Sequence, residues 1–408
     1  MRTTAGAAYE RALSLYHGEA VSTQASPRSR DLAALWALDP AVTYLNHGSF
    51  GACPRAVLEA QSALRLELER EPVDFLDGTL PARLDAARSE LAGFLGSDPA
   101  DLVFVPNATN AVNAVLRSQR LKPGDELLVT NQTYAACRKA AEFVAAQVDA
   151  RIVVAQLPFP VRSEEEIVAA VLSCASPRTR LALLDHVTSP TALVLPIARL
   201  IGELSARGID TLVDGAHAPG MVPLQLGSLG AAYYTGNAHK WLCAPKGAAF
   251  LHVRRDRHSD IHPLVISHGY QGGLHAEFDW AGTSDPTAWL CIPQSLRLIG
   301  SLLPGGWPEV MARNRALALQ ARRLMLETLR IEAPCPEGMI GSMASIPLPP
   351  GARGSDCKGL HDWFRERNVE TWLHPHPQLL LRISAQLYND MDQFRKLTGL
   401  LAEALHGR

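Results

Sequence analysis

Short apolar runs alternate with segments of helical periodicity between residues 102 and 213, and this alternation limits the possible folds more than any other feature of the chain. The apolar runs cover residues 102–105, 127–130, 152–157, 181–187 and 211–213. Helical periodicity occupies residues 135–148, 164–174 and 197–207 between them. Strand, helix and strand at this spacing form βαβ units, whose strands lie parallel in one sheet. We therefore predict an α/β fold with a large, mainly parallel sheet wrapped in helices.

Polar or hydroxylated residues follow these runs at their C-terminal ends. Two of them carry opposite charges, because Asp214 ends one run and Lys240 follows a further short run at residues 231–234. The carboxyl ends of neighbouring parallel strands open on one crevice, so both side chains are expected at the same rim. A lysine can form a Schiff base with a carbonyl cofactor, and an aspartate can pair with a protonated pyridine nitrogen. The two residues alone also fit a surface ion pair beside a buried turn.

Three further segments of the chain have both a functional and a structural interpretation. Asn107 and Thr109 lie where a strand passes directly into a helix, and they belong either to an anion-binding helix start or to an ordinary N-cap. Asn46 and His47 begin a glycine-containing loop that either lines a site or simply joins two elements. Arg382 interrupts an apolar run near the C-terminus, where it serves either a structural pair or a carboxylate clamp.

Composition excludes several classes of protein. The chain has 408 residues, of which 47% are hydrophobic and 20% are charged, so it can bury a sizeable core and is not a disordered protein. A formal net charge of −2 provides no electrostatic basis for binding nucleic acid or an anionic membrane. The seven cysteines are dispersed without paired spacing, which indicates reduced thiols and a cytoplasmic location. No apolar run approaches the length of a membrane span.

The pattern of the chain changes from about Ile292 onward, which indicates a second domain. This part contains a long helical segment, a proline-rich turn or edge strand, and an apolar run, at residues 311–329, 346–350 and 379–384. Such a mixture is typical of a small α+β unit. We predict a large domain at residues 40–295 and a small domain formed by residues 1–39 together with residues 296–408.

Several motifs occur in a consistent order along the chain. They are LNHGSFGACP at residues 45–54, NATNAVN at 107–113, DHVTSPT at 185–191, DGAHA at 214–218, YTGNAHKW at 234–241, WAGTSDPT at 280–287 and LRISAQLYN at 381–389. With these motifs the chain resembles the class V aminotransferase family of fold type I pyridoxal-phosphate enzymes, and within it the isopenicillin N epimerase-like branch. The resemblance implies the fold type I PLP-dependent transferase architecture, pyridoxal 5'-phosphate (PLP) as cofactor, and a small amino-acid substrate.

The resemblance also assigns roles around the cofactor ring. Lys240 would carry the cofactor as a Schiff base and then move the substrate proton. Asp214 would pair with the pyridine nitrogen and keep it protonated, and Tyr134 would stack on the face of the ring. Three polar side chains would lie around the ring and its phenolic oxygen, namely Thr188, Ser189 and His217.

The phosphate of the cofactor would lie at the helix start. Thr109 and the amides of Ala108 and Thr109 would hold it, helped by Asn237 and His239. Thr283 would reach the phosphate bound by a neighbouring subunit, which implies a homodimer with shared active sites.

The resemblance also assigns contacts with the substrate. Arg382 would clamp its α-carboxylate, with Asn46 and His47 nearby. Three reactions can start from the quinonoid intermediate of such an enzyme: reprotonation on the opposite face, loss of a β-substituent, and transfer of the amine. Epimerisation needs a second acid, for which His47 or Tyr134 is available, whereas β-elimination needs little beyond Lys240.

The resembled branch includes C–S lyases of ergothioneine biosynthesis and enzymes of lincosamide assembly. We therefore predict a PLP-dependent lyase that cleaves the C–S bond of an S-substituted cysteine in specialised, antibiotic-type metabolism. The alternatives are an epimerase of the isopenicillin N epimerase type and a decarboxylating deaminase or aminotransferase on the same scaffold.

The sequence disfavours both a persulfide-forming cysteine desulfurase and a zinc protein. Cysteine desulfurases of the wider family carry a mobile catalytic cysteine shortly before the carboxylate-binding arginine. Residues 371–377 occupy that interval here and contain no cysteine, while Cys357 lies outside it. A zinc site formed by His361, His374 and His376 lacks a carboxylate or cysteine companion, so we predict no metal.

Overall fold

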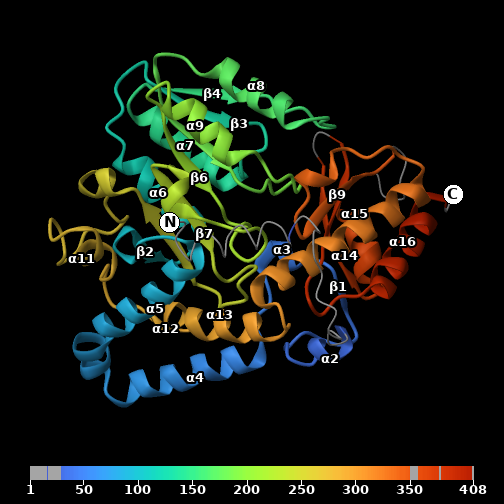
Figure 1. Ribbon diagram of the computed structural model, residues 1–408, viewed down its shortest axis with the longest axis horizontal. Coiled ribbons are helices and arrows are strands. Elements are labelled where there is room, and N and C mark those ends of the chain that lie inside the picture. The colour runs from blue at the N-terminus through green and yellow to red at the C-terminus, as the bar shows by residue number, and fades with distance from the viewer. Residues whose placement is uncertain (1–15, 17–28, 350–356, 376–377, 407–408) are drawn as a thin grey trace, which may run out of the picture.

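The computed structural model describes residue 16 and residues 29–349, 357–375 and 378–406 of the chain. Its central element is a seven-stranded sheet in the order β2-β8-β7-β6-β5-β3-β4 (Figure 1). The strands are β2 (Leu102–Val105), β3 (Glu126–Thr130), β4 (Arg151–Ala155), β5 (Thr179–Asp185), β6 (Asp210–Asp214), β7 (Tyr233–Asn237) and β8 (Ala249–Val253). The pairs of β8 with β2 and β7 are antiparallel, and the other pairs in this sheet are parallel. The predicted mainly parallel α/β sheet is confirmed.

Helices cover both faces of the sheet (Figure 1). One face packs against α6 (Ala108–Ser118) and α7 (Ala135–Gln147), and the other packs against α5 (Leu80–Leu95), α8 (Glu164–Cys174), α9 (Ile197–Ser205) and α13 (Ile292–Ser301). The remaining helices of this part are α2 (Ser29–Ala33), α3 (His47–Phe50), α4 (Arg55–Arg70), α10 (Leu226–Leu229), α11 (Leu274–Phe278) and α12 (Thr287–Leu290). Short 3-10 and π turns lie at η1 (Asp74–Thr79), η2 (Pro99–Asp101), η3 (Arg255–Asp260) and η4 (Glu337–Met339).

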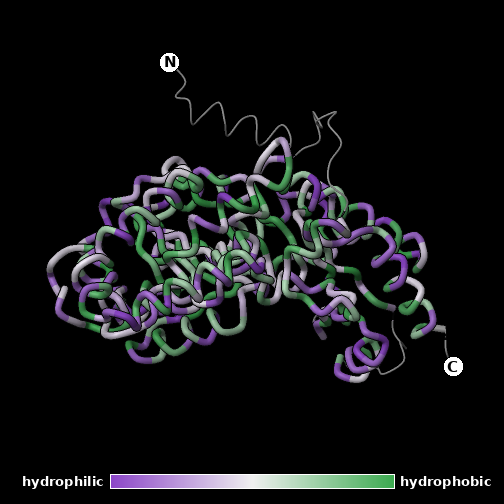
Figure 2. The backbone as a smooth tube through the Cα atoms, turned by 90° about the horizontal axis from the view of Figure 1, so that it is seen from below, coloured by the Kyte–Doolittle hydropathy of each residue, from purple (hydrophilic) through white to green (hydrophobic). Residues whose placement is uncertain are grey.

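Side chains along each strand alternate between the two apolar layers. In β5, Leu183 packs in the layer of α6 and α7, whereas Leu184 packs in the layer of α8 and α9. The alternation continues to the end of the strand, so Asp185 projects to the side of α6 and α7. Asp214 ends β6, is the register partner of Asp185, and projects to the same side. Figure 2 shows the accompanying distribution, with hydrophobic segments running through the middle of the molecule and hydrophilic ones at its periphery.

The C-terminal part of the chain forms a second, smaller unit beside the large sheet (Figure 1). Its three-stranded antiparallel sheet has the order β11-β12-β9. The elements are α14 (Gly306–Leu329), β9 (Met343–Pro347), α15 (Cys357–Arg365), β11 (Trp372–His374), β12 (Leu380–Ser384) and α16 (Met391–His406). β9 is an edge strand of this sheet and ends at Pro347, so the proline-rich segment overlaps the end of an edge strand, one of the two predicted forms. The predicted small α+β unit near the C-terminus is confirmed.

The N-terminal segment joins this smaller unit through a short parallel pair. β1 (Thr43–Tyr44) pairs with β10 (Val369–Glu370). The predicted boundary after residue 295 falls inside α13, and residues 1–15 and 17–28 lie outside the described residues. We retain the division into residues 40–295 on one side, and residues 1–39 with 296–408 on the other, as a proposal.

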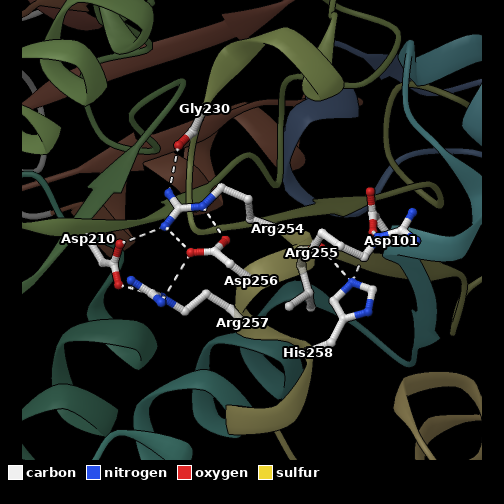
Figure 3. Close-up of polar contacts among 9 residues, drawn as sticks. Asp101, Asp210, Gly230, Arg254, Arg255, Asp256, Arg257 and His258 are labelled. Carbon is white, nitrogen blue, oxygen red and sulfur yellow. Dashed lines mark hydrogen bonds and ion pairs between the residues drawn. The ribbon is translucent and has the colours of Figure 1, made fainter.

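A network of ion pairs holds the edge of the large sheet opposite its carboxyl ends (Figure 3). Asp210, the first residue of β6, accepts hydrogen bonds from Arg254 at 3.1 Å and from Arg257 at 2.8 Å. Both arginines also pair with Asp256. These side chains are partly exposed, so each pair contributes roughly 0–1 kcal/mol, and their main effect is to tie η3 to β6.

Two global features bear on where the protein acts. Among the described residues, no helix is long and apolar enough to cross a membrane. All seven cysteines lie in the described part of the chain and are free thiols.

The loop that contains α3 packs directly against the backbone that carries Lys240. Gly51 follows α3 with φ of 69°, and a Cβ atom there would lie 2.1 Å from the carbonyl oxygen of His239. Lys246 adds a hydrogen bond from its Nζ to the Gly51 carbonyl at 3.2 Å. A side chain at position 51 is therefore excluded both by the backbone conformation and by the close approach of two chain segments.

This close approach predicts a difference between two glycine-to-alanine variants. Gly51→Ala should destabilise the protein by about 2 kcal/mol or more, because it combines a left-handed backbone with a clash against main-chain atoms. Gly93→Ala in α5 is the matched control, since its Cβ would enter open space. It should stabilise the protein by about 0.5–1 kcal/mol. Urea unfolding of both variants measures the difference, and equal stabilities would contradict the packing described here.

Candidate active site

A cavity of about 560 Å³ lies at the carboxyl ends of the parallel strands. It is formed by the ends of β2, β3, β5, β6 and β7 and the segments that follow them. This is the crevice that the polar residues after the apolar runs predicted. Nine of the predicted site residues line it: Ala108, Thr109, Tyr134, Ser189, Asp214, His217, Asn237, His239 and Lys240.

Lys240 lies in a dry environment beside His217. Its Nζ is 3.3 Å from His217 Nε2. Burial, reinforced by the charge of Arg382 and opposed by Asp214, lowers the pKa of Lys240 from 10.5 to about 8. Burial and the nearby Lys240 charge hold the pKa of His217 well below its usual range, so this imidazole is neutral. A neutral His217 that accepts from Lys240 carries its proton on Nδ1, which has no partner among the described residues.

Asp214 is held at the base of the cavity by two donors. It is 4% exposed. Its Oδ1 accepts from the Ala216 amide at 3.0 Å, and its Oδ2 accepts from the Cys137 thiol at 3.2 Å. Cys137 lies in α7, one helical turn after Tyr134, so the same helix carries the exposed ring of Tyr134 and the donor beneath it. Burial, strengthened by Asp214, raises the pKa of Cys137 well above its ordinary value and keeps it a neutral thiol.

The start of α6 provides a site for an anion. Asn107 caps the helix, since its side chain accepts from the Asn110 amide at 2.9 Å. The Ala108 amide donates to Asn237 Oδ1 at 2.9 Å, so this amide is already engaged and Asn237 presents its Nδ2 group as a donor instead. Thr109 lines the cavity at the next position. The cap and the anion site therefore coexist at one helix start.

His239 flanks this anion site in a defined tautomer. Its Nδ1 lies 3.2 Å from the Ala248 carbonyl, to which it donates. Burial lowers the pKa of His239 to about 4, so the ring is neutral and Nε2 is an acceptor. A phosphate dianion beside it would favour protonation of Nε2, which would then become a donor.

Arg382 is a buried cation behind the cavity wall. It is 2% exposed, and its guanidinium lies 4.3 Å from the centre of the Trp372 ring. Its donors contact the Ser189 carbonyl at 2.7 Å and the hydroxyls of Ser189 and Ser49 at 3.1 Å. Burial lowers its pKa to about 10, so it stays charged at neutral pH. Within the described residues no carboxylate pairs with it, and its Nε has no partner.

Asn46 and His47 do not line the cavity, so their predicted contacts with the substrate stay a prediction. His47 is fully buried beneath the lysine, with Nε2 3.0 Å from the Lys240 carbonyl and Nδ1 2.8 Å from the Tyr388 hydroxyl. Asn46 donates to Glu370 at 3.2 Å and accepts from Ser49 at 2.6 Å. The helical turn of α3 rotates these two side chains away from the cavity. Ser49 and Phe50 of the same loop line it instead.

Thr188 and Thr283 also lie outside the cavity lining. Thr188 is buried, and its hydroxyl is shared with Thr191 at 2.8 Å and with the Leu193 amide at 2.8 Å, so it closes a turn behind the wall. Thr283 lines two surface depressions together with Arg65 and Asp285. One of them shares Pro106, Lys246 and Gly247 with the cavity. The predicted contact of Thr283 with a neighbouring subunit's phosphate stays a prediction.

Sequence reasoning missed several residues of the cavity and its support. They are Ser49, Phe50, Cys137, Asp185 and Lys246. Asp185 had a usable signal, because it ends an apolar run next to Asp214 in a parallel sheet. Cys137 had none, since only the packing of α7 on the sheet places its thiol under a carboxylate.

The described residues contain no cluster of three side chains suited to a metal ion. His361 contacts Glu370 at 3.4 Å, and His374 stacks on Trp372. The third histidine of that alternative, His376, lies outside the described residues.

The donor set fits PLP. A lysine with a lowered pKa, a buried carboxylate held by neutral donors, an aromatic side chain at the rim and a helix start for a phosphate surround one cavity. The unpartnered Nδ1 of His217 is a further donor that a ring oxygen would satisfy. Together with the large sheet and the small antiparallel unit, this cavity defines a PLP-dependent enzyme of fold type I.

The comparison with known proteins identifies the family. A model described as aminotransferase class-V matches residues 67–335. The chain belongs to the class V aminotransferase family, as its motifs predicted, and PLP is its cofactor. It is 36% identical, over 91% of its length, to an isopenicillin N epimerase of Streptomyces clavuligerus, of which 96% is covered. It is 31% identical, over 88% of its length, to a probable chloroplastic L-cysteine desulfhydrase of Arabidopsis thaliana, of which 82% is covered.

The fold agrees with solved structures. A cystine C–S lyase in complex with its product cysteine persulfide matches with a TM-score of 0.75 and 20% identity, covering 89% of this chain and 98% of that one. The fold type I architecture is therefore confirmed.

The lowered pKa of Lys240 predicts a pH dependence of cofactor attachment. Only the unprotonated amine can attack an aldehyde, so the rate at which PLP attaches to cofactor-free protein should rise with pH and level off above about pH 8. Stopped-flow absorbance measures this rate, with Lys240→Ala as the blank. A rate that keeps rising to the ordinary lysine value of 10.5 would show that Lys240 is not desolvated.

Proposed function

We propose that this protein is a PLP-dependent C–S lyase that eliminates the sulfur substituent from an S-substituted cysteine. The observation that carries the proposal is the pairing of two buried groups, the Lys240 amine with its lowered pKa and the Arg382 cation without a carboxylate partner among the described residues. An amine base and a carboxylate clamp are the two groups that reaction at the Cα of an amino acid requires. Relatives named L-cysteine desulfhydrase support a substrate with a Cβ–S bond.

The residues of the chain take the following parts in this proposal. Arg382 binds the α-carboxylate and orients the Cα–H bond toward Lys240. Lys240 removes the Cα proton, and its ammonium form returns a proton to the departing sulfur. Bound PLP supplies an electron sink for the negative charge left at Cα. Tyr134 would cover the ring from the rim, and His217 and Ser189 would hold a ring oxygen.

The phosphate is proposed to lie at the start of α6. Thr109 and the Asn237 Nδ2 group donate to it, with His239 on the same side. Ala108 contributes by orienting Asn237 rather than by donating its own amide to the ligand. A helix start and neutral donors can hold a phosphate without a lysine cluster.

Persulfide formation on the enzyme is disfavoured. No cysteine is among the residues that line the cavity. Cys137 lies closest to the proposed chemistry, but its thiol is buried and donates to Asp214. A thiol whose pKa is raised in this way is a poor nucleophile.

Epimerisation is the second candidate, and the 36% identity to an isopenicillin N epimerase favours it. It needs an acid on the face of the substrate opposite Lys240. His47 is excluded because it lies behind the lysine backbone, with its pKa lowered by burial to about 3. Tyr134 is the remaining candidate, since it lines the cavity. Decarboxylating deamination or amine transfer on the same residues is a further alternative.

We also propose a homodimer that acts in the cytoplasm, within specialised metabolism of the antibiotic type. Exposed apolar residues support an interface, namely Phe50, Leu264, Val265, Ile266 and Tyr270. Thr283 lies at a surface depression that a second subunit can face. The free state of all cysteines agrees with a reducing compartment.

Product analysis tests the reaction. PLP-loaded protein incubated with an S-alkyl cysteine should release pyruvate, ammonia and a thiol in equal amounts. Lys240→Ala should release none of them. If deuterium from the solvent enters Cα with inversion and no thiol is released, the protein is an epimerase and the proposed elimination is wrong.

The carboxylate clamp predicts a separation of kinetic effects. Arg382→Lys should raise KM for the amino acid by about 10- to 100-fold, because an ammonium cannot reproduce the two-donor geometry of the guanidinium. The PLP content should stay that of the wild type. Arg395→Lys is the control, since Arg395 pairs with Asp392 on the surface. A wild-type KM in Arg382→Lys would remove Arg382 from substrate binding.

A further inference from the structure

Two buried carboxyl groups lie side by side at the base of the cavity, although the chemistry proposed above uses only one of them. Asp185 ends β5 and Asp214 ends β6, and the two are register partners on parallel strands. Both line the cavity, and they are 3% and 4% exposed. The function of Asp185 is therefore open.

The two groups have different hydrogen-bond partners. Both oxygens of Asp214 accept from donors, the Ala216 amide and the Cys137 thiol. Asp185 accepts through Oδ1 from the Tyr134 amide at 3.4 Å, whereas its buried Oδ2 has no partner among the described residues. A buried oxygen without a donor costs more free energy in a charged carboxylate than in a neutral carboxyl group. The geometry therefore favours the neutral form of Asp185, whereas donors hold both oxygens of Asp214.

The surrounding charges lead to the same assignment. Four side chains surround the two carboxyl groups. Tyr134 and the neutral thiol of Cys137 come from α7, the neutral imidazole of His217 follows β6, and Lys240 follows β7. Lys240 feels the charge of Asp214, whereas no cation in the described part of the chain is among the groups that shift the pKa of Asp185. Burial and the neighbouring Asp214 raise the pKa of Asp185 well above its usual range. Two adjacent carboxyl groups in a dry site share one negative charge rather than carrying two.

We propose that Asp185 is a positioning residue that acts as a neutral acid, holding the Tyr134 turn and leaving one negative charge, that of Asp214, at the base of the cavity. One charge matches one protonated ring nitrogen, whereas two would hold an excess anion next to Lys240. The proposal rests on the proposed pairing of Asp214 with the ring nitrogen of PLP. The ligand of this site is the pyridine ring of PLP. Asp185 does not bind the ring but keeps Tyr134 and Asp214 in place around it.

Three variants of the PLP-loaded enzyme test the proposal: Asp185→Asn, Asp185→Ala and Asp214→Asn. The dissociation constant for PLP and the pH midpoint of its visible absorbance band are measured for each. Asp185→Asn copies a neutral carboxyl group, so both quantities should stay within about twofold and about 0.3 pH units of the wild type. Asp185→Ala removes the acceptor for Tyr134 and should weaken PLP binding by about tenfold. Asp214→Asn removes the negative charge and should lower the midpoint by about one pH unit or more.

Each contrary result has a defined meaning. A midpoint in Asp185→Asn that falls as far as in Asp214→Asn would show that Asp185 is charged, and wild-type PLP binding in Asp185→Ala would show that it positions nothing. Either result overturns the proposal. A wild-type midpoint in Asp214→Asn would instead overturn the pairing of Asp214 with the ring, on which the proposal rests.

A spectroscopic measurement covers the case in which the alanine variant does not fold. Infrared difference spectra of the wild type and Asp185→Asn at neutral pH report protonated carboxyl groups directly. A protonated carboxyl band that is present in the wild type and lost in Asp185→Asn supports the proposal. Its absence from the wild-type spectrum overturns it, whatever the activity of the enzyme.

Discussion

The in-register pairing of three parallel strands is the constraint on which the rest of this site depends. β5 and β6 end at the same level and β7 runs on to Asn237, so that their ends and the turns that follow bring Asp185, Asp214 and Lys240 to one small volume. A shift of one residue in either strand would turn a carboxyl group into the opposite apolar layer, because side chains alternate between faces. The hydrophobic layers on both sides of the sheet therefore fix the position of the charged groups as well as the fold.

The same burial that fixes these groups also sets their protonation. Lys240 is desolvated, so a larger fraction of its amine is unprotonated near neutral pH than in an exposed lysine, and His217 beside it stays neutral. Arg382 remains a cation, although no carboxylate among the described residues compensates it. An uncompensated buried charge costs free energy in the empty site, and an anionic ligand recovers that cost on binding.

Support for the lysine comes from behind it. His47 holds the Lys240 carbonyl, Gly51 lets the α3 loop approach the same backbone, and Lys246 ties the loop from the other side. The motif at residues 45–54 therefore acts through the position of Lys240, and the part of it that reaches the cavity is Ser49 and Phe50. The loop at residues 45–54, far from Lys240 in the sequence, thus positions the lysine from behind, and Ser49 and Phe50 are the two residues of its α3 turn that line the cavity.

The sequence by itself determined the sheet, the rim where polar residues gather, the family and half of the cavity lining, because strand periodicity and short motifs are local properties of the chain. It also showed that one aspartate and one lysine belong together. Only the tertiary structure decided which side chains face the cavity and which support it from behind. His47 and Thr188 turned out to lie behind the wall, and Asp185 and Cys137 at the base of the cavity, because these placements depend on helix rotation and on contacts between segments far apart in the chain. Protonation was likewise decided by the tertiary structure, since it follows from burial and from neighbouring charges that no local pattern records.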